Sequence, residues 1–150
     1  MTIDGALSSS LAMLVAAMAP ARDRWWIIGS AAVRLHGVAT TVADVDVLVS
    51  VRDADDLDTR LRVGLRPGVG NALFRSSRYG QWCEPPLPIE FMADLTVRGV
   101  PLAEPTSRVP MCVGDATVYV PDVAEMVTIL DLFGRAKDRA RAASLRARPS

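Results

Sequence analysis

Two short apolar runs, each joined to small or acidic residues, constrain this chain more than any other feature. The first run, residues 25–28, ends at Gly29 and Ser30, and the second, residues 44–49, reads Asp-Val-Asp-Val-Leu-Val. Because side chains alternate along a strand, the two carboxylates of the second run point to the same face, roughly 6 to 7 Å apart. Acids this close in an apolar sheet are expected to share divalent metal ions.

Composition favours a folded single domain over several other classes of protein. The chain has 150 residues, half of them hydrophobic, and its formal charges sum to zero, which is compatible with one domain and a real core. Neither an internal repeat nor a low-complexity tract is visible. The basic residues are sixteen arginines and one lysine, scattered along the sequence, which argues against strong nonspecific attraction to a polyanion. We therefore expect a single domain over residues 1–150.

The cysteines and the N-terminal segment argue against a zinc site and a membrane span. Cys83 and Cys112 lie far apart and lack metal-ligand spacing with His36, so we expect two buried thiols in a reducing cytoplasm. The apolar stretch 11–21 has no basic start, and its apolar residues repeat with helical spacing. This favours an amphipathic first helix, with a secretory signal as the alternative. The stretch is too short to span a bilayer, so we expect a cytoplasmic protein without membrane contact.

The remaining sequence alternates predicted strands and helices. Strands are expected at residues 25–28, 44–51, about 72–77 and 89–95, with a hairpin at 111–113 and 116–120. Helices are expected at residues 31–36, in a segment capped by Asp53 with Leu57 and Leu61 on one face, and as a C-terminal pair at 123–133 and 135–146. This order predicts an α/β (α+β) domain in which a mixed, twisted sheet is flanked by helices.

The order of these motifs resembles a known superfamily. The pair Gly29 and Ser30, the acids at residues 44–46 and an acid in a later strand are similar to the nucleotidyltransferase superfold of polymerase-β-like enzymes, aminoglycoside nucleotidyltransferases and minimal nucleotidyltransferases. The strand ending at residues 118–122 and the later Arg-x-Lys-Asp at 135–138 resemble the nucleotidyltransferase toxins of abortive-infection and toxin–antitoxin systems. The resemblance spans roughly residues 25 to 145.

The resemblance implies a magnesium-dependent transfer of a nucleoside monophosphate from a nucleoside triphosphate to a hydroxyl acceptor, with release of pyrophosphate. Gly29 and Ser30 would cradle the β- and γ-phosphates, because a residue without a side chain allows close approach and backbone amides can donate to phosphate oxygens. Asp44 and Asp46 would be catalytic residues that hold one or two Mg²⁺ ions.

A third catalytic carboxylate is expected on a neighbouring strand. Glu90 is our choice as the third metal ligand, since it lies in an apolar run where an unpaired acid would be costly. Asp94 is the alternative, on the same face but roughly 13 Å further along the strand. Related enzymes more often carry an aspartate here. Arg135 and Lys137, the only lysine, fall where the resemblance places contacts to the nucleotide phosphates.

Two departures from the family pattern leave a second function open. Glu90 replaces the usual aspartate, and Arg141 stands where related sequences commonly have an acid, although Asp138 is expected to hold Arg135 or Lys137 in place. The alternative is therefore a catalytically inactive module that binds a nucleotide or a protein. For the enzyme, the expected acceptor is a transfer RNA end or a protein side chain, then a small aminoglycoside-like molecule, and an antitoxin-like protein is an expected partner.

Overall fold

A mixed four-stranded sheet forms the centre of the computed structural model, which describes residues 3–67, 69–71 and 73–148. Its strands lie in the order β1 (Trp26–Ile28), β2 (Val45–Leu48), β6 (Ile89–Ala93) and β5 (Arg78–Trp82). The two central strands, β2 and β6, are parallel, and each edge strand is antiparallel to its neighbour. The mixed sheet predicted from the sequence is therefore confirmed.

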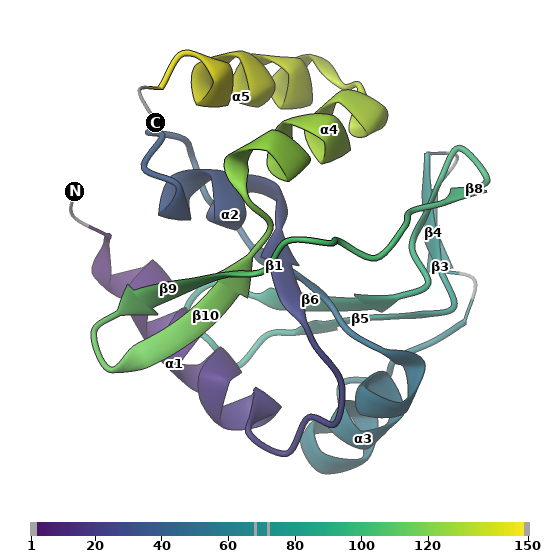
Figure 1. Cartoon of the computed structure of the whole chain (residues 1–150). Helices are drawn as coiled ribbons and strands as arrows, with labels where there is room; N and C mark the ends of the chain where they lie inside the picture. Colours follow the sequence, from purple (N-terminus) through teal and green to yellow (C-terminus); the bar gives the residue numbers. More distant parts are fainter. Residues whose placement is uncertain (1–2, 68, 72, 149–150) are drawn as a thin grey trace.

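The described residues also form a second, smaller sheet and a hairpin (Figure 1). The smaller sheet contains β3 (Val69–Gly70), β4 (Phe74–Ser76), β7 (Thr96–Val97) and β8 (Val100–Pro101), in that order. The hairpin pairs β9 (Val109–Val113) with β10 (Ala116–Val120), as the sequence predicts. The strand expected at about residues 72–77 is observed as the shorter β4, and residue 72 lies outside the described residues.

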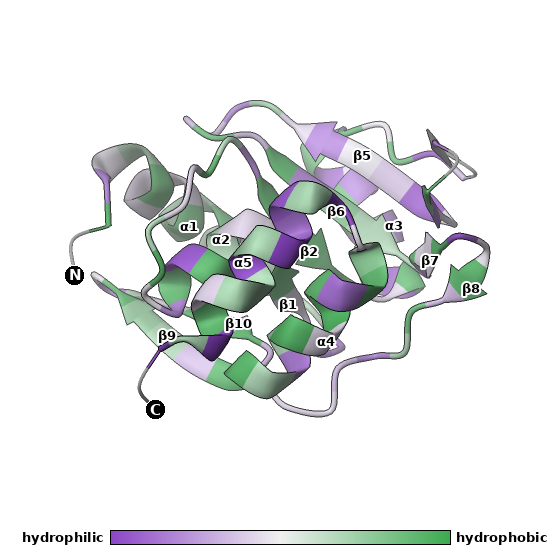
Figure 2. Cartoon of the chain, turned by 90° about the horizontal axis from the view of Figure 1, so that it is seen from above, coloured by the Kyte–Doolittle hydropathy of each residue, from purple (hydrophilic) through white to green (hydrophobic). Residues whose placement is uncertain are grey.

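Helices lie at both ends of the molecule, with α4 and α5 over α2 at one end and α1 and α3 at the other (Figure 1). They are α1 (Gly5–Met18), α2 (Gly29–Leu35), α3 (Val51–Leu61), α4 (Val123–Phe133) and α5 (Ala136–Arg146). The C-terminal pair α4 and α5 is confirmed, and Gly134 ends α4 in the left-handed conformation that favours glycine, with φ of 70°. Hydrophobic residues predominate along α4 and hydrophilic ones along α5 (Figure 2).

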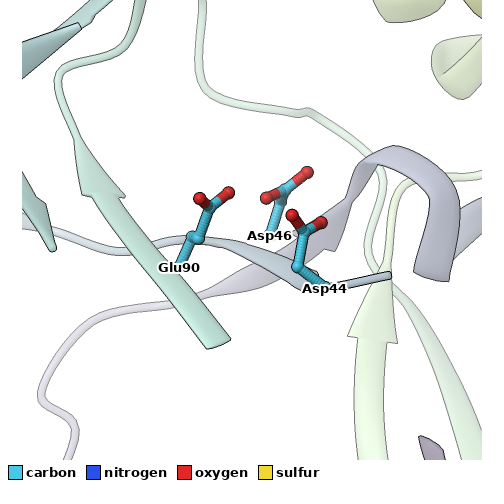
Figure 3. Close-up of side chains that lie close together, drawn as sticks. All are labelled: Asp44, Asp46 and Glu90. Atoms are coloured by element: carbon cyan, nitrogen blue, oxygen red, sulfur yellow. The ribbon is translucent and has the colours of Figure 1, made fainter. Parts of the chain in front are cut away.

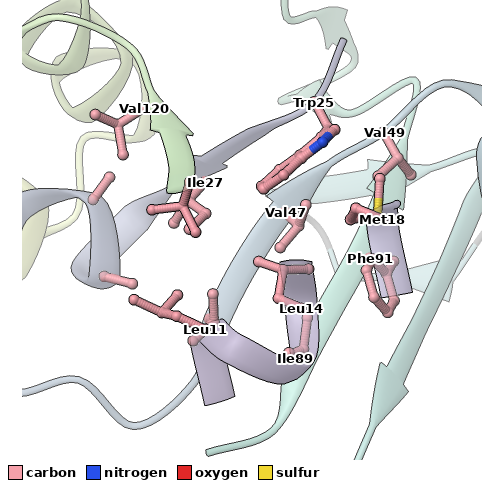
Figure 4. Close-up of a cluster of buried hydrophobic side chains, with 14 of the residues drawn as sticks. Leu11, Leu14, Met18, Trp25, Ile27, Val47, Val49, Ile89, Phe91 and Val120 are labelled. Carbon is pink, nitrogen blue, oxygen red and sulfur yellow. The ribbon is translucent and has the colours of Figure 1, made fainter. Parts of the chain in front are cut away.

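Alternation along β2 and β6 separates a core face from a polar face. Val45 and Val47 of β2 are fully buried, whereas Asp46 and Leu48 are half-buried on the opposite face. On the core face, side chains of α1 pack against the strands. Figure 4 labels Leu11, Leu14 and Met18 of α1 together with Val47 of β2 and Ile89 and Phe91 of β6. The expected amphipathic first helix is therefore confirmed, and its apolar side covers the sheet.

A second apolar cluster lies on the same face of the sheet as Asp46 and Glu90. Its buried residues come from β1, β6, the segment after β6, β7 and α4: Ile28, Met92, Leu95, Val97, Ile129 and Phe133. Partly buried side chains of β4 and β5, including Phe74 and Tyr79, pack against it. This cluster joins the central sheet, the smaller sheet and α4, and it fixes the surroundings of Asp46 and Glu90.

The sequence misplaced the boundary between the second strand and the following helix. The strand ends at Leu48, and Ser50 rather than Asp53 is the N-cap of α3, because the Ser50 hydroxyl accepts a hydrogen bond from the Asp53 amide. The buried Asp53 carboxylate instead accepts the backbone amides of Arg22 and Asp23, each at 2.9 Å. Asp53 therefore fixes the chain segment before β1.

The two cysteines are exposed, contrary to the burial expected from the sequence. Cys83 directly follows the edge strand β5, and Cys112 occupies an outward position of β9, where half-buried and exposed residues alternate. Edge positions escape burial because only one of their sides is covered. Trp25 and Trp26 are buried. Within the described residues, no helix is long and apolar enough to cross a bilayer.

Candidate active site

Three carboxylates predicted from the sequence converge on the polar face of the central sheet (Figure 3). Asp46 on β2 lies opposite Glu90 on β6 in the parallel register, and Asp44 directly precedes β2. One carboxylate oxygen from each of Asp44, Asp46 and Glu90 lies within 4.8 Å of the other two. Magnesium takes hard oxygen ligands at about 2.0 to 2.1 Å, so this donor set fits divalent cations after small side-chain adjustments.

The electrostatics of the three acids also fit a cation site. Burial raises the pKa of Asp46 well above its ordinary value of 3.8, and the hydrogen bond to Glu90 and the charge of Asp44 raise it further. Burial likewise raises the pKa of Asp44, and the charge of Glu90 adds to this effect. Concentrated negative charge with poor solvation is costly, and bound cations would offset that cost.

Gly29 approaches Asp46 closely at the end of β1. Gly29 has a φ of 70°, and a Cβ atom built at this residue would lie 2.6 Å from Asp46 Oδ2. Any other residue would therefore combine backbone strain with a steric clash against a candidate metal ligand. Ser30 follows at the start of α2, is 7% exposed and lines the same pocket. The structure thus places the predicted Gly29 and Ser30 beside the acids.

A pocket of about 400 Å³ is lined both by the three acids and by cationic side chains. Three of these cations belong to the α5 segment, in which Arg135 is the N-cap residue and Lys137 and Arg141 lie within the helix. Their charges act to lower the pKa of Asp44, against the larger raising effects of burial and Glu90. All the sequence-predicted site residues line this pocket: Gly29, Ser30, Asp44, Asp46, Glu90, Arg135 and Lys137.

Arg135, which lines the pocket, is held by an ion pair and by two aromatic rings. The Asp138 carboxylate, which is 1% exposed, accepts Arg135 Nε at 2.6 Å and Nη2 at 3.1 Å. The guanidinium carbon also lies 4.9 Å from the ring centroid of Phe74 and 6.0 Å from that of Phe133. A paired and stacked guanidinium loses little further freedom on binding a phosphate. Asp138 therefore positions Arg135, as the sequence suggested.

Two pocket residues were missed as ligand-binding candidates at the sequence level. The Tyr79 hydroxyl donates a very short hydrogen bond to Glu90 Oε1, and burial together with Glu90 raises the pKa of Tyr79. No motif marks Tyr79, because its strand β5 was not predicted. Arg141 lies on the pocket wall, where its Nε donates to Thr40 Oγ1 at 3.2 Å. Arg141 follows Lys137 by four residues, which places the two side chains side by side on a helix, and this spacing could have identified Arg141 from the sequence.

Other candidates lie outside this cluster. Asp94 follows the end of β6, with φ of 53°, and accepts a 2.7 Å hydrogen bond from Ser77 Oγ. It lines a neighbouring cavity, so geometry groups Glu90 rather than Asp94 with the two aspartates. His36 Nε2 lies 2.7 Å from the Pro121 carbonyl oxygen, a contact that ties α2 to the start of α4. His36 therefore has a packing role.

Comparisons with known proteins identify the fold. Neither a family model nor a curated protein matches the chain. A candidate nucleotidyltransferase from Thermotoga maritima aligns with a TM-score of 0.67 and 16% identity over 91% of this chain and 88% of its own. The solution structure of the antibiotic-resistance factor ANT(2″)-Ia aligns with a TM-score of 0.63 and 11% identity, over 95% and 84% of the two chains. The chain therefore has the nucleotidyltransferase fold, as its motifs predicted.

Proposed function

We propose that this protein is a divalent-metal-dependent nucleotidyltransferase that moves a nucleoside monophosphate from a nucleoside triphosphate to a hydroxyl acceptor and releases pyrophosphate. One observation carries the proposal. In a nucleotidyltransferase fold, carboxylate oxygens of Asp44, Asp46 and Glu90 lie within 4.8 Å of one another beside a pocket lined by cations. A pocket lined by both acids and cations suits a polyphosphate held through metal ions.

The three acids are assigned as the catalytic and metal-binding residues. Asp44 and Asp46 would hold both of two Mg²⁺ ions between them, and Glu90 would complete one of the two sites. When bound, Mg²⁺ would neutralise phosphate charge and stabilise the departing pyrophosphate. We also assign Glu90 the role of accepting the proton of the attacking hydroxyl, because its carboxylate lies in the pocket beside both aspartates.

We assign nucleotide binding to the cations of the α5 segment and to the turn after β1. Arg135, Lys137 and Arg141 would bind the β- and γ-phosphates, because they line the pocket and their charges act on Asp44. Gly29 leaves room for the triphosphate next to Asp46, and the Ser30 hydroxyl can donate to a phosphate oxygen. ATP is the first triphosphate to test.

The acceptor and the cellular setting are further parts of the proposal. A transfer RNA end, a protein side chain and a small hydroxyl compound are the acceptor classes. The resemblance of the C-terminal segment to toxin nucleotidyltransferases supports a search for an antitoxin-like partner in the cytoplasm. Co-purification of the tagged chain with the products of genes adjacent to its own tests the partner.

Transfer of label from α-³²P-labelled triphosphates tests the reaction directly. We expect Mg²⁺-dependent labelling of an acceptor and release of pyrophosphate. Asp44→Asn together with Asp46→Asn should abolish both, whereas Asp115→Asn, an exposed acid in the β9–β10 turn, should leave both unchanged. Full activity of the double variant would refute the assignment.

The second candidate function is a nucleotide-binding module without turnover. It is favoured by the Tyr79 hydroxyl, which already occupies one oxygen of Glu90, and by Glu90 itself in place of aspartate. Calorimetry separates the two functions. Binding of Mg·ATP without pyrophosphate release across the acceptor panel supports the module, and turnover excludes it.

A further inference from the structure

Tyr79 contacts the candidate metal site from the edge strand of the central sheet. Its hydroxyl donates a very short hydrogen bond to Glu90 Oε1, and its side chain lines the same pocket as the three acids. A tyrosine hydroxyl is neutral and carries one hydrogen to donate. Tyr79 is therefore an uncharged hydrogen-bond donor in direct contact with the third candidate metal ligand.

The strand register explains why Tyr79 is the residue that reaches Glu90. On β5, Gln81 lies directly opposite Glu90 of β6. Tyr79 precedes Gln81 by two residues, so it shares that face of the sheet and is a diagonal neighbour of Glu90, at a separation of roughly 7 to 8 Å that an aromatic side chain can span. The carboxamide oxygen of Gln81 instead accepts a contact from Cys83 Sγ at 3.5 Å. The longer tyrosine side chain thus bonds the carboxylate.

The position of Tyr79 is fixed by contacts other than the one with Glu90. Its backbone exchanges two hydrogen bonds with Arg66, in which the Arg66 amide donates at 2.9 Å and the Tyr79 amide donates at 3.0 Å. A Cβ atom at the next residue, Gly80, would lie 2.4 Å from Leu65 Cδ2, so glycine allows the segment around Leu65 to pack closely against β5. The Tyr79 side chain also packs against the second apolar cluster. Backbone and packing therefore aim the hydroxyl at the pocket.

This hydrogen bond limits how the Glu90 carboxylate can bind a cation. A glutamate has one more rotatable bond than an aspartate, and holding Oε1 on a fixed hydroxyl removes much of the freedom that this bond adds. The hydrogen of the hydroxyl, which is the positive end of its dipole, lies against Oε1. A cation that contacted both carboxylate oxygens would lie beside that positive end. Glu90 is therefore prepared to bind a cation through one oxygen.

The number of oxygens that a glutamate offers affects which divalent cation fits. Mg²⁺ requires a near-ideal octahedron with ligands at about 2.0 to 2.1 Å, whereas Ca²⁺ takes six to eight oxygens at about 2.3 to 2.6 Å and often both oxygens of one carboxylate. Mn²⁺ shares the preference of Mg²⁺ for octahedral oxygen sites. A glutamate restricted to one oxygen therefore suits the smaller cations and withholds a ligand from Ca²⁺.

We propose that Tyr79 is a positioning residue that restricts Glu90 to binding through one oxygen and thereby makes the site select Mg²⁺ and Mn²⁺ over Ca²⁺. The inference rests on the metal-binding part of the proposed function and adds the residue that determines the choice of metal. Tyr79 acts through Glu90 and is not itself a metal ligand. Because hydrogen-bond partners of metal ligands typically change metal affinity by about 10- to 100-fold, the effect is large enough to measure.

Calorimetric titration of the full chain with Mn²⁺ and, separately, with Ca²⁺ tests the inference. The unmodified protein should bind Mn²⁺ at least tenfold more tightly than Ca²⁺. Tyr79→Phe keeps the packed ring and removes only the hydroxyl, so it should weaken Mn²⁺ binding about tenfold and lower the ratio of Mn²⁺ to Ca²⁺ affinity at least fivefold. Tyr119→Phe is the matched control, because the second tyrosine of the chain lies on β10 and does not line the pocket. It should leave both affinities unchanged.

A double-mutant cycle shows whether Tyr79 acts through Glu90. In the Glu90→Gln background, Tyr79→Phe should cause no further change in the affinity ratio, because no carboxylate remains to be restricted.

The outcomes separate this inference from the proposed function. Equal Mn²⁺ and Ca²⁺ affinities in the unmodified protein, an unchanged ratio in Tyr79→Phe, the same change in Tyr119→Phe, or a full change in the Glu90→Gln background overturns the inference while the proposed function stands. The expected change in ratio without transfer of label to any acceptor supports the inference and overturns the proposed reaction. Failure of the unmodified protein to bind Mn²⁺ overturns both.

Discussion

At the scale of single residues, the candidate site opposes the stability of the fold. Asp46 is half-buried on β2 with Glu90 opposite and Asp44 beside it, and these surroundings raise its pKa well above 3.8. Removing solvent from like charges costs free energy in the folded state, and this cost is absent in the unfolded chain. Residues kept despite such a cost are typical of functional sites.

Asp46→Asn should therefore stabilise the metal-free protein by about 1 kcal/mol, within the range of typical stabilising substitutions. Because the folded pKa exceeds the unfolded one, the destabilising effect of Asp46 is absent below about pH 3.8 and increases as the pH rises through the folded pKa. The gain should thus be larger at pH 8 than at pH 5. Urea unfolding in EDTA at both values measures it, with Asp115→Asn as control, and a loss of stability at pH 8 would contradict the prediction.

The close approach of Gly29 to Asp46 gives a second prediction at this scale. Gly29→Ala and Gly99→Ala both place a side chain at positive φ, 70° and 79°, and each should cost about 1 to 2 kcal/mol of stability. A Cβ atom at Gly99 would have open space, whereas one at Gly29 would contact Asp46 Oδ2 at 2.6 Å. Only Gly29→Ala should also weaken Mn²⁺ binding, at least tenfold by calorimetry. Equal Mn²⁺ affinity in the two variants would refute the steric argument.

At the scale of elements, α5 determines the charge of the candidate nucleotide pocket. Its N-cap residue Arg135 is fixed by Asp138 in a capping box, and Lys137 and Arg141 lie one helical turn apart and line the pocket. The neighbouring Arg139 is exposed and does not line the pocket. The helix thus offers both test positions and a control of the same charge.

Lys137→Gln and Arg141→Gln should each lower Mg·ATP affinity about tenfold, because each removes a charge-assisted contact worth about 1.4 kcal/mol or more. Arg139→Gln should leave the affinity unchanged within a factor of two. Calorimetry at two salt concentrations measures the effect, and the salt dependence should be weaker in the two pocket variants. Equal losses of Mg·ATP affinity in all three variants would contradict this prediction, because they would indicate a general electrostatic effect of the helix rather than direct contacts with the phosphates.

At the scale of the whole molecule, the candidate pocket joins three parts of the fold. The central sheet supplies the acids, the smaller sheet supplies Phe74 and Arg75, and α4 and α5 supply Phe133 and the cations. The parts are held together by the apolar cluster around Met92 and by Arg98, whose guanidinium donates to the Leu132 and Phe133 carbonyl oxygens at the end of α4. A ligand that contacts all three parts stabilises the fold as a unit.

Saturation with Mg·ATP analogue at about 100 times its Kd should therefore stabilise the protein by about 2.7 kcal/mol. For a chain of this size, such a gain corresponds to a Tm increase of roughly 5 to 10 °C. The variant carrying Asp44→Asn and Asp46→Asn should lack the increase, and Asp115→Asn should retain it. Differential scanning calorimetry measures the shift, and an unchanged Tm in the unmodified protein would contradict nucleotide binding in this pocket.

Local chemistry in the sequence determined most of the elements. The helical repeat of apolar residues predicted α1, and the helix predicted at residues 123–133 has the ends observed for α4. The acid spacing predicted that Asp44 and Asp46 share a face, as Figure 3 shows. These features depend on neighbours within a few residues, which a single sequence displays directly.

Only the tertiary structure decided which distant residues meet. The parallel register of β2 with β6 places Glu90, and not Asp94, opposite Asp46, and β5 brings Tyr79 to Glu90. Strand register between segments far apart depends on packing of both sheet faces and the turns, which no local pattern encodes. The neighbouring cavity that Asp94 lines arises in the same way, because its lining residues include members of β1, β2, β6 and the segment before β9. The sequence by itself determined the chemical groups available for a site, and long-range packing decided their partners.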